Sequence, residues 1–354
     1  MILAGNKSQF DILSLQKRVM LIAAALLLLG CSKVLDNDDI VVFQGSTMGT
    51  TYSIKVAGFP ESVDLEQIQG EIEALLVRVN QSMSTYIPDS EISRINRSDG
   101  TAPIPVSSMM FDVLTESLRI SVLSKGALDM TVAPLVNLWG FGADPKTTAI
   151  PDDQKIKSLL KQTGYKKIRV TGTPLTISKS HPKLTIDLSA IAKGYAVDQV
   201  SLLLESKGLA NYLVEIGGEI RTNGFKIDQA PWIVGIERPV SGERVIQQVI
   251  SIGNRSMATS GDYRNYFEEN GKRFSHLIDP NSGRPIEHKL VSASVVHQSC
   301  MTADGFATAF MVMGTGSAYE LATKQNLAVY FLVKTESGFE VKTTPAFDAF
   351  LVKN

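Results

Sequence analysis

The chain has 354 residues, of which 44% are hydrophobic and 20% charged, and its formal net charge is −1. This composition is that of a folded globular protein and excludes a largely disordered chain. A charge balance so close to neutral gives no support for nucleic-acid binding or for a polybasic membrane surface. The two cysteines are Cys31 and Cys300, and no CxxC or zinc-binding spacing occurs.

The N-terminus has the pattern of an export signal. Lys17 and Arg18 precede an apolar run over residues 19–29, which is roughly half the ~20 residues that a membrane-spanning helix needs. Positive charges followed by a short apolar run are typical of a secretory signal peptide. An uncleaved N-terminal anchor or a buried helix is the alternative.

The end of this run resembles a bacterial lipobox, Leu28-Leu29-Gly30-Cys31, although Leu29 is larger than the usual residue at its position. In a lipobox the cysteine is diacylated and becomes the first mature residue. We therefore expect a lipoprotein signal peptide over residues 1–30, and a lipidated Cys31 with a polar tether over residues 31–40.

Lipidation of Cys31 predicts a location on the periplasmic side of a bacterial membrane. Ser32 follows the cysteine where Asp would favour the inner membrane, so the pattern leans towards the outer membrane and leaves the choice open. Cys300 then has no partner for a disulfide within the chain. We interpret Cys300 as a small buried hydrophobic residue and not as a nucleophile.

The body of the chain, residues 41–354, alternates between strand and helix patterns without a linker long enough to divide it. Apolar residues at helical spacing predict a helix over residues 64–83, and glycines end further helices predicted over residues 106–125, 152–162 and 190–206. Two strands are predicted around Gly49, and short strands around Ile168 and Ile177 and over residues 184–186, 212–216, 232–236, 245–252, 290–296 and 328–333. This order favours one large α+β domain with mixed β-sheets flanked by helices.

One candidate ligand-binding turn lies in the segment Ile186–Ala196. Asp187 follows a predicted strand, and Lys193 stands at the start of a predicted helix. Free N–H groups and the positive end of the helix dipole suit a phosphate there, and Lys193 adds a point charge. The alternative is a helix-capping Asp187 beside a solvated lysine.

Glycines mark a second candidate turn, where the strand that ends at Ile216 runs into Gly217-Gly218. Glycine lets the backbone approach a ligand closely, although such a pair is more often a simple turn. The segment 126–142 is a third candidate, with an aromatic-capped helix end as its alternative.

A histidine provides a candidate for proton transfer. The segment 274–283 begins as a strand that contains His276 and ends in a turn rich in Asp, Pro, Asn and Gly. An imidazole pKa near neutrality suits a general base, and Asp279 is a second candidate. A structural histidine is the alternative.

The segment Met301–Phe310 is the most informative part of the chain. If it is helical, Asp304 and Thr308 lie one turn apart on the same face. A carboxylate and a hydroxyl so placed suit a hard cation such as Mg²⁺, and the neighbouring alanines let a large ligand come close. The alternative is a tightly packed core helix.

In their order along the chain these segments resemble the FAD:protein FMN transferase (ApbE) family, long labelled thiamine biosynthesis lipoproteins. The resemblance covers nearly everything after about residue 40. The segments that carry it are Met48–Thr51, Ser84–Tyr86, Gly126–Pro134, Leu138–Gly142, Asp187–Gly194, Gly217-Gly218, Ala258–Gly261, His276–Pro280 and Ala303–Thr308.

The resemblance implies an enzyme that binds FAD and Mg²⁺, transfers FMN through a phosphoester bond to a Thr or Ser of a target protein, and releases AMP. Flavin would then be a substrate and not a redox cofactor. It implies metal ligands at Asp304, Thr308 and the backbone carbonyl of Ala190, and a catalytic role for His276. It also implies FAD contacts from Met48, Tyr86, Ala127, Leu128, Asp129, Asp187, Lys193 and Ile278.

By the same resemblance, the acceptors are membrane flavoproteins such as subunits of the sodium-pumping quinone reductase or of Rnf-type complexes. Two rival functions stay open. The same site would act as an Mg²⁺-dependent FAD pyrophosphatase if water replaced the Thr hydroxyl, and a lipid-anchored FAD carrier would need no chemistry at all.

Overall fold

The computed structural model describes residues 40–60, 63–142, 150–239, 245–262, 266–269 and 272–352. The predicted signal peptide, Cys31 and nearly all of the tether lie outside these residues. In the described part of the chain, no helix combines the length and the apolar character needed to cross a membrane.

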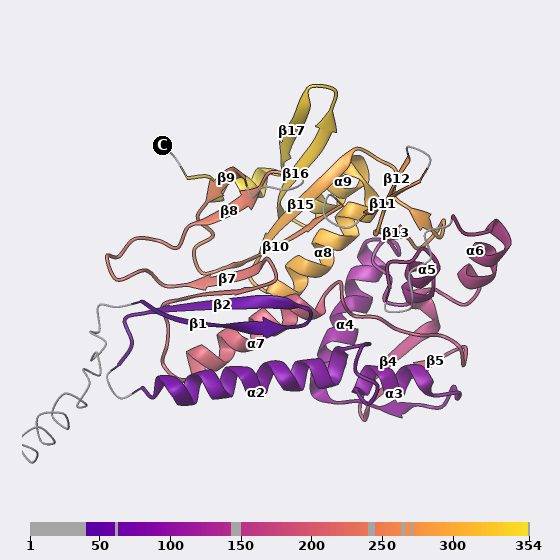
Figure 1. Ribbon diagram of the computed structural model, residues 1–354, viewed down its shortest axis with the longest axis horizontal. Coiled ribbons are helices and arrows are strands. Elements are labelled where there is room, and N and C mark those ends of the chain that lie inside the picture. Colours follow the sequence, from indigo (N-terminus) through magenta and orange to yellow (C-terminus); the bar gives the residue numbers. More distant parts are fainter. Residues whose placement is uncertain are drawn as a thin grey trace, which may run out of the picture. The chain divides into compact units, whose positions relative to one another are not determined.

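An eight-stranded sheet forms the centre of the body (Figure 1), with the strand order β1-β2-β6-β7-β10-β15-β16-β17. Its strands are β1 (Ile40–Thr47), β2 (Thr50–Ala57), β6 (Tyr212–Ile216), β7 (Glu219–Asn223), β10 (Ser256–Gly261), β15 (Leu290–His297), β16 (Ala328–Thr335) and β17 (Gly338–Thr343). The predicted α+β class is confirmed. The strand directions are not mixed, because every pair in this sheet is antiparallel. Tight turns join β1 to β2, β6 to β7 and β16 to β17, and such short connections impose the antiparallel direction.

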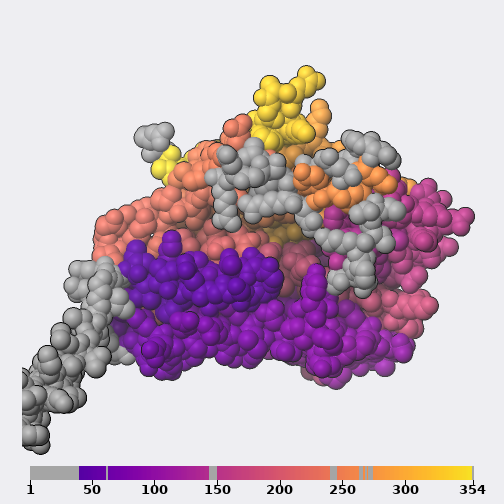
Figure 2. Space-filling model, in the orientation of Figure 1, coloured from indigo at the N-terminus to yellow at the C-terminus, as the bar shows by residue number. Residues whose placement is uncertain are grey.

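Helices cover one face of this sheet. Helix α8 (Cys300–Met313) packs on β10 and β15, α7 (Ala192–Ser206) packs on β6 and β7, and the two helices pack on each other. Helix α2 (Leu65–Met83) begins at the capping side chain of Asp64 and buries one stripe against α7, as the helical spacing of its apolar residues predicted. In the space-filling view, β1, β2 and α2 lie together along one side of the body (Figure 2). The remaining helices are α3 (Glu91–Arg97), α4 (Ser108–Leu123), α5 (Ala133–Leu138), α6 (Asp153–Leu160) and α9 (Thr315–Lys324).

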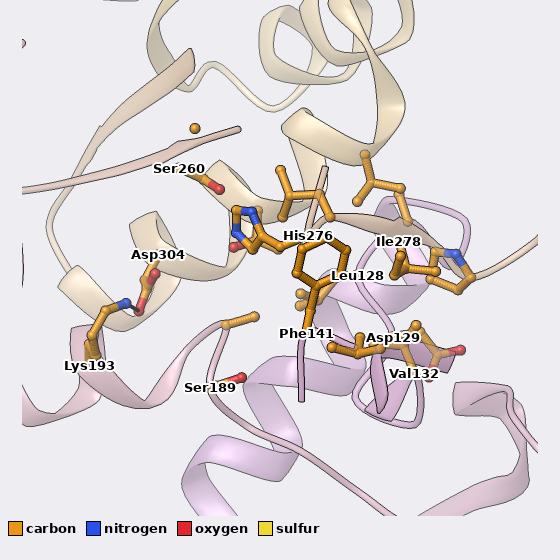
Figure 3. Close-up of a pocket in the computed structure, with 18 of the residues that line it drawn as sticks. Leu128, Asp129, Val132, Phe141, Ser189, Lys193, Ser260, His276, Ile278 and Asp304 are labelled. Carbon is orange, nitrogen blue, oxygen red and sulfur yellow. Dashed lines mark ion pairs between the residues drawn. The ribbon is translucent and has the colours of Figure 1, made fainter. Parts of the chain in front are cut away.

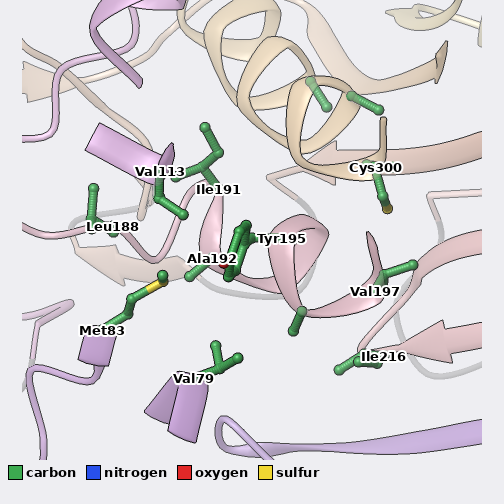
Figure 4. Close-up of a cluster of buried hydrophobic side chains, with 14 of the residues drawn as sticks. Val79, Met83, Val113, Leu188, Ile191, Ala192, Tyr195, Val197, Ile216 and Cys300 are labelled. Carbon is green, nitrogen blue, oxygen red and sulfur yellow. The ribbon is translucent and has the colours of Figure 1, made fainter. Parts of the chain in front are cut away.

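The apolar core between α2, α7, α8 and the sheet is continuous (Figure 4). Val79 and Met83 of α2 face Ala192 and Tyr195 of α7 there. Cys300 is fully buried at the first turn of α8, which confirms its interpretation as a small hydrophobic residue. The core therefore fixes where the first turns of α7 and α8 lie.

The opposite face of the sheet is covered by the hairpin of β8 (Val234–Glu237) and β9 (Ile246–Ile250) and by the 3₁₀ helix η2 (Pro345–Phe350). A separate three-stranded sheet has the order β3-β5-β4, from β3 (Ile104–Pro105), β4 (Ile168–Gly172) and β5 (Leu175–Lys179). Two short hairpins complete the fold: β11 (Tyr266–Glu269) with β12 (Lys272–Ser275), and β13 (Ile278–Asp279) with β14 (Arg284–Pro285).

Two local predictions were wrong. Residues 184–186 form no strand, because the Asn96 side chain takes the place of a neighbouring strand: its Nδ2 donates to Ile186 O at 2.9 Å and its Oδ1 accepts from Ile186 N at 2.8 Å. His276 is not in a strand either. It lies directly after β12, in the bend that leads to β13.

Candidate functional site

Two cavities lie side by side and share Ser189 and Lys193 in their walls. The first cavity has a volume of about 460 Å³, and the second has a volume of about 580 Å³. Both volumes are in the range of small-molecule sites. Residues 189–193, which lead into and begin α7, therefore lie between two neighbouring cavities.

The structure brings together the site residues that the sequence singled out in the described part of the chain. The first cavity is lined by Ala127, Leu128, Asp129, Ala190, Lys193, His276, Ile278, Asp304 and Thr308. The second is lined by Met48, Tyr86, Asp187 and again Lys193. Only Cys31 lies outside the described residues.

Three charged side chains meet beside the junction of the cavities, and we call Lys193, Glu219 and Asp304 the charged centre. The Lys193 Nζ lies 3.2 Å from Glu219 Oε1 and 3.8 Å from Asp304 Oδ2. Lys193 and Asp304 point toward each other across the first cavity wall (Figure 3). Glu219 and Asp304 are 3% and 4% exposed, whereas the Lys193 side chain keeps 28% of its surface open. Lys193 is therefore paired with two buried carboxyl groups while its side chain lines both cavities.

Burial dominates the electrostatics of the charged centre. It raises the pKa of Glu219 and the pKa of Asp304, in both cases against the attraction of Lys193. Burial by itself would lower the pKa of Lys193, but the carboxyl groups of Asp304 and Glu219 outweigh it and raise that pKa. Lys193 therefore stays positively charged at neutral pH.

A glycine allows the charged centre to form. Gly194 lies in the first turn of α7, and a Cβ at this position would stand 2.4 Å from Cys300 O and 2.8 Å from Asp304 Cβ. Without a side chain there, α7 approaches α8 closely enough for the Gly194 N–H to donate to Asp304 Oδ2 at 3.0 Å. The same contact places an acidic side chain at the positive end of the α7 dipole.

Asp187 shapes the turn before α7. Its Oδ1 accepts a hydrogen bond from Ser189 N at 2.7 Å, and the N-cap of α7 is Ile191, which makes no side-chain cap. The alternative of a helix-capping Asp187 beside a solvated lysine therefore does not hold for either residue. The turn directs Ser189 and Ala190 at the first cavity.

Asp129 also lines the first cavity, but its carboxylate is hydrogen-bonded to Thr131 and Tyr165. Asp129 Oδ1 accepts from Thr131 N at 2.8 Å and Thr131 Oγ1 at 2.6 Å, and Oδ2 accepts from Tyr165 N at 2.8 Å. Burial raises the pKa of Asp129 against these bonds. The side chain thus fixes the shape of the loop that carries Ala127 and Leu128.

His276 is half-buried at the first cavity and lies edge-on to Phe141, with ring centroids 6.3 Å apart. Phe141 stacks on Phe267 at 5.4 Å, and Phe267 stacks on Phe274 at 5.0 Å. Phe274 in turn stacks on Trp139 at 5.7 Å. The aromatic segment after α5 therefore ends that helix, with Trp139 as the C-cap residue, and it also supports the cavity wall that carries His276.

Helix α8 is both a core helix and a cavity wall. Ala303, Phe306 and Ala307 are buried, while Asp304 and Thr308 line the first cavity together with Ala190. Among the described residues, no cluster of three or more His, Cys, Asp or Glu side chains is arranged to hold a metal. A cation here would therefore rely on one carboxylate together with hydroxyl and carbonyl oxygens, which are the hard donors that Mg²⁺ prefers.

Glu219 is the functional residue that the sequence did not single out. It follows the Gly217-Gly218 turn and starts β7, and a Cβ on Gly217 would stand 3.3 Å from Lys193 Cδ. The signal was present in the strand that runs into Gly-Gly-Glu. Glu219 joins the site only through its contact with Lys193, which belongs to a different element, so the local pattern did not reveal it.

The fold and the site thus define an α+β protein with a two-part small-molecule site and a charged centre at its junction. A sequence model of the ApbE family matches residues 48–331. The chain belongs to the ApbE family, so the predicted resemblance is confirmed.

Relatives resemble the chain over almost its whole length. The FAD:protein FMN transferase of Vibrio cholerae is 46% identical over 332 residues, which are 94% of this chain and 98% of that protein. The protein of the same name from Haemophilus influenzae is 44% identical and covers 93% of this chain and 96% of its own length.

Solved structures of ApbE proteins are also similar to this chain. The flavin transferase ApbE from Vibrio cholerae superposes with a TM-score of 0.83 at 44% identity, over 88% of this chain and 99% of that one. The ApbE protein from Thermotoga maritima has a TM-score of 0.79 at 26% identity and covers 89% of this chain and 100% of that one.

Proposed function

We propose that this protein is an FAD:protein FMN transferase that moves FMN from FAD to a Thr or Ser hydroxyl of a target protein and releases AMP. Support comes from family membership and from the names of relatives that share nearly the whole chain. The observation that carries the proposal is Lys193, a charged side chain at the junction of two cavities. A dinucleotide has two bulky ends and a diphosphate between them, and this arrangement matches that shape.

In the proposed reaction, the acceptor hydroxyl oxygen forms a bond to the FMN phosphorus of FAD. The bond between that phosphorus and the bridging oxygen breaks, and AMP leaves with this oxygen and its electron pair. The hydroxyl proton must go to a base. Such transfers depend mainly on positioning and on compensation of negative charge at the phosphoryl oxygens.

Lys193 supplies part of that compensation from the protein itself. Its ammonium is kept charged by Glu219 and Asp304, and the side chain lines both cavities. A fixed cation in a site with little water stabilises developing charge more strongly than it would in bulk water.

His276 is the candidate that takes the hydroxyl proton. It lines the same cavity as Lys193 and Asp304, and the ring of Phe141 supports it from one side. Asp279, the second candidate from the sequence, binds Asn281 N through its Oδ1 at 2.9 Å, and it does not line either cavity.

We propose that Asp304, Thr308 and the Ala190 carbonyl would hold Mg²⁺. The charged centre fits such an ion, because two buried carboxyl groups face one ammonium, and Thr308 and Ala190 line the same cavity as Asp304. When both carboxyl groups are ionised, a negative charge is left over. When bound, Mg²⁺ would neutralise charge on the phosphoryl oxygens.

Incubation with FAD, Mg²⁺ and a candidate acceptor tests the function. Flavin fluorescence that stays on the denatured acceptor, with stoichiometric AMP, supports transfer. Free FMN and AMP with an unlabelled acceptor would indicate a pyrophosphatase instead, and unchanged FAD that remains bound would indicate a carrier.

We further propose that the protein is lipid-anchored through Cys31 on the periplasmic side of a bacterial membrane. Suitable acceptors there are flavoprotein subunits of a sodium-pumping quinone reductase or an Rnf-type complex. Mass spectrometry of the mature N-terminus tests the anchor: a diacylated Cys31 supports it, and an unmodified Met1 or a cleavage elsewhere contradicts it.

A further inference from the structure

In the proposed reaction Glu219 only helps to keep Lys193 charged, although it is among the most deeply buried carboxyl groups of the described chain. It lines the first cavity, and its Oε1 lies closer to the Lys193 ammonium than Asp304 does, at 3.2 Å against 3.8 Å. A buried carboxyl group is costly unless it is paired. Its position beside the site therefore calls for a function.

The partner of Glu219 is shared. Lys193 Nζ has three N–H donors, and it stands between Glu219 and Asp304. Asp304 is also the proposed ligand of a divalent cation. A lysine paired with Asp304 alone would compete with that cation for the same carboxylate.

Glu219 has unused capacity to hold the lysine. Its Oε1 faces Lys193, while its Oε2 is buried without a hydrogen-bond partner in the described part of the chain. Both oxygens of one carboxylate can accept from the same ammonium. The Lys193 stem runs past Gly217, where a Cβ would stand 3.3 Å from Lys193 Cδ, so the absence of a side chain there lets the stem reach Glu219.

We propose that Glu219 is a positioning residue for Lys193: it takes over the ammonium when Asp304 engages a divalent cation, so that both positive charges remain in the site. This inference rests on the proposed function, because it assumes a cation at Asp304. It adds a role for Glu219 that acts through Lys193 and not through contact with the cation.

The test is Mn²⁺ binding to the purified protein without FAD, followed by the electron paramagnetic resonance signal of free Mn²⁺. We expect Glu219→Gln to weaken Mn²⁺ binding about tenfold or more. In that variant Lys193 pairs with Asp304 alone and competes with the cation for its carboxylate. Lys193→Met removes the competitor, so adding it to Glu219→Gln should restore most of the lost affinity. The same Lys193→Met change in the wild-type background, where Glu219 holds the ammonium, should strengthen Mn²⁺ binding less than it does in the Glu219→Gln background.

A control Lys–Glu pair exists elsewhere in the fold. Glu71 of α2 pairs with Lys207, the C-cap residue of α7, with 2.6 Å between Oε1 and Nζ, and neither residue lines either cavity. Glu71→Gln makes the same chemical change to a Lys–Glu pair and should leave Mn²⁺ binding unchanged. Thermal unfolding of each variant confirms that binding is compared between folded proteins.

Three outcomes overturn the inference. If Glu219→Gln weakens Mn²⁺ binding equally with and without Lys193, Glu219 acts through its own charge or as a ligand. If Glu219→Gln has no effect, the lysine does not compete. If wild-type protein shows no saturable Mn²⁺ binding, no cation engages Asp304. FMN transfer by the wild-type enzyme is measured separately, so a failure of the proposed function is told apart from a failure of this coupling.

Discussion

The amide of Gly194 donates a hydrogen bond to the buried carboxylate of Asp304, with 3.0 Å between N and Oδ2. This one contact joins the first turn of α7 to the first turns of α8. It sets the distance between Lys193, which follows Ala192 at the start of α7, and the carboxylate that α8 presents. Several consequences of this arrangement are measurable.

Replacement of Gly194 by Ala should separate the two helices. The new Cβ would stand 2.4 Å from the Cys300 carbonyl oxygen, which belongs to the backbone and cannot rotate away. We expect a loss of about 1–3 kcal/mol in the free energy of unfolding, measured by denaturant titration. Gly70→Ala in α2 is the control, because nothing lies within 4 Å of its Cβ position, and it should stabilise by about 0.5–1 kcal/mol. Equal stability of Gly194→Ala and wild type would contradict the close approach.

Asp304→Asn keeps an acceptor for the Gly194 N–H and removes the negative charge. We expect metal-dependent FMN transfer to be lost while the protein still folds, since the carboxylate is proposed to hold a cation. The measurement is transfer rate against Mg²⁺ concentration, with circular dichroism to monitor the fold. A variant with the Mg²⁺ dependence of the wild type would show that the metal site is elsewhere.

His276→Ala should reduce transfer by about 10²–10⁴-fold, which is the usual range for a general acid or base. FAD affinity should change much less, because other residues line most of both cavities. Single-turnover rates and FAD fluorescence titration separate the two effects. His181→Ala is a control outside the cavities. A change within a factor of about two in transfer rate would leave His276 with a structural role only.

The stability of the protein should fall as the pH is lowered through the range where an ordinary histidine titrates. Burial lowers the pKa of His297, and its Nδ1 accepts a hydrogen bond from Ser299 N, the N-cap residue of α8, at 3.0 Å. Below pH of about 6.5 the unfolded chain protonates this side chain while the folded protein resists it. The unfolded state then binds more protons, so this contribution is present at higher pH and lost on acidification.

His297→Gln tests that dependence, because glutamine does not titrate in this range. The difference in unfolding free energy between neutral and mildly acidic pH should be smaller in the variant than in the wild type. Identical pH dependence in the two proteins would assign the effect to other groups.

Lys179 should be essential for stability although it forms no ion pair in the described structure. It is 1% exposed, and its ammonium donates to the carbonyl oxygens of Ile95, Ser98 and Pro182 at 3.0, 2.8 and 3.2 Å. Lys179→Met would leave these buried acceptors unpaired, at a cost of about 2 kcal/mol or more. Lys155→Met on the exposed face of α6 is the control and should change stability by less than about 0.5 kcal/mol. Equal effects of the two substitutions would contradict this role.

Much of the site could be predicted from the sequence, because its parts are local patterns. The helical spacing of apolar residues predicted α2, with Asp64 at its N-cap, and the spacing of Asp304 and Thr308 placed both on one face of α8. Family membership was equally visible in the order of the motifs. Helix periodicity and capping depend on residues within a few positions of one another, so a sequence records them directly.

The tertiary structure alone decided which of these local patterns meet. The strand predicted over residues 184–186 does not form, because the Asn96 side chain hydrogen-bonds to Ile186. The carboxylate of Asp129 accepts a hydrogen bond from Tyr165 N, 36 residues further along the chain. Glu219 became part of the charged centre only because β7 and α7 bring it to Lys193. Such contacts join segments far apart in the chain, and their energies depend on burial and distance, which no local pattern of residues contains.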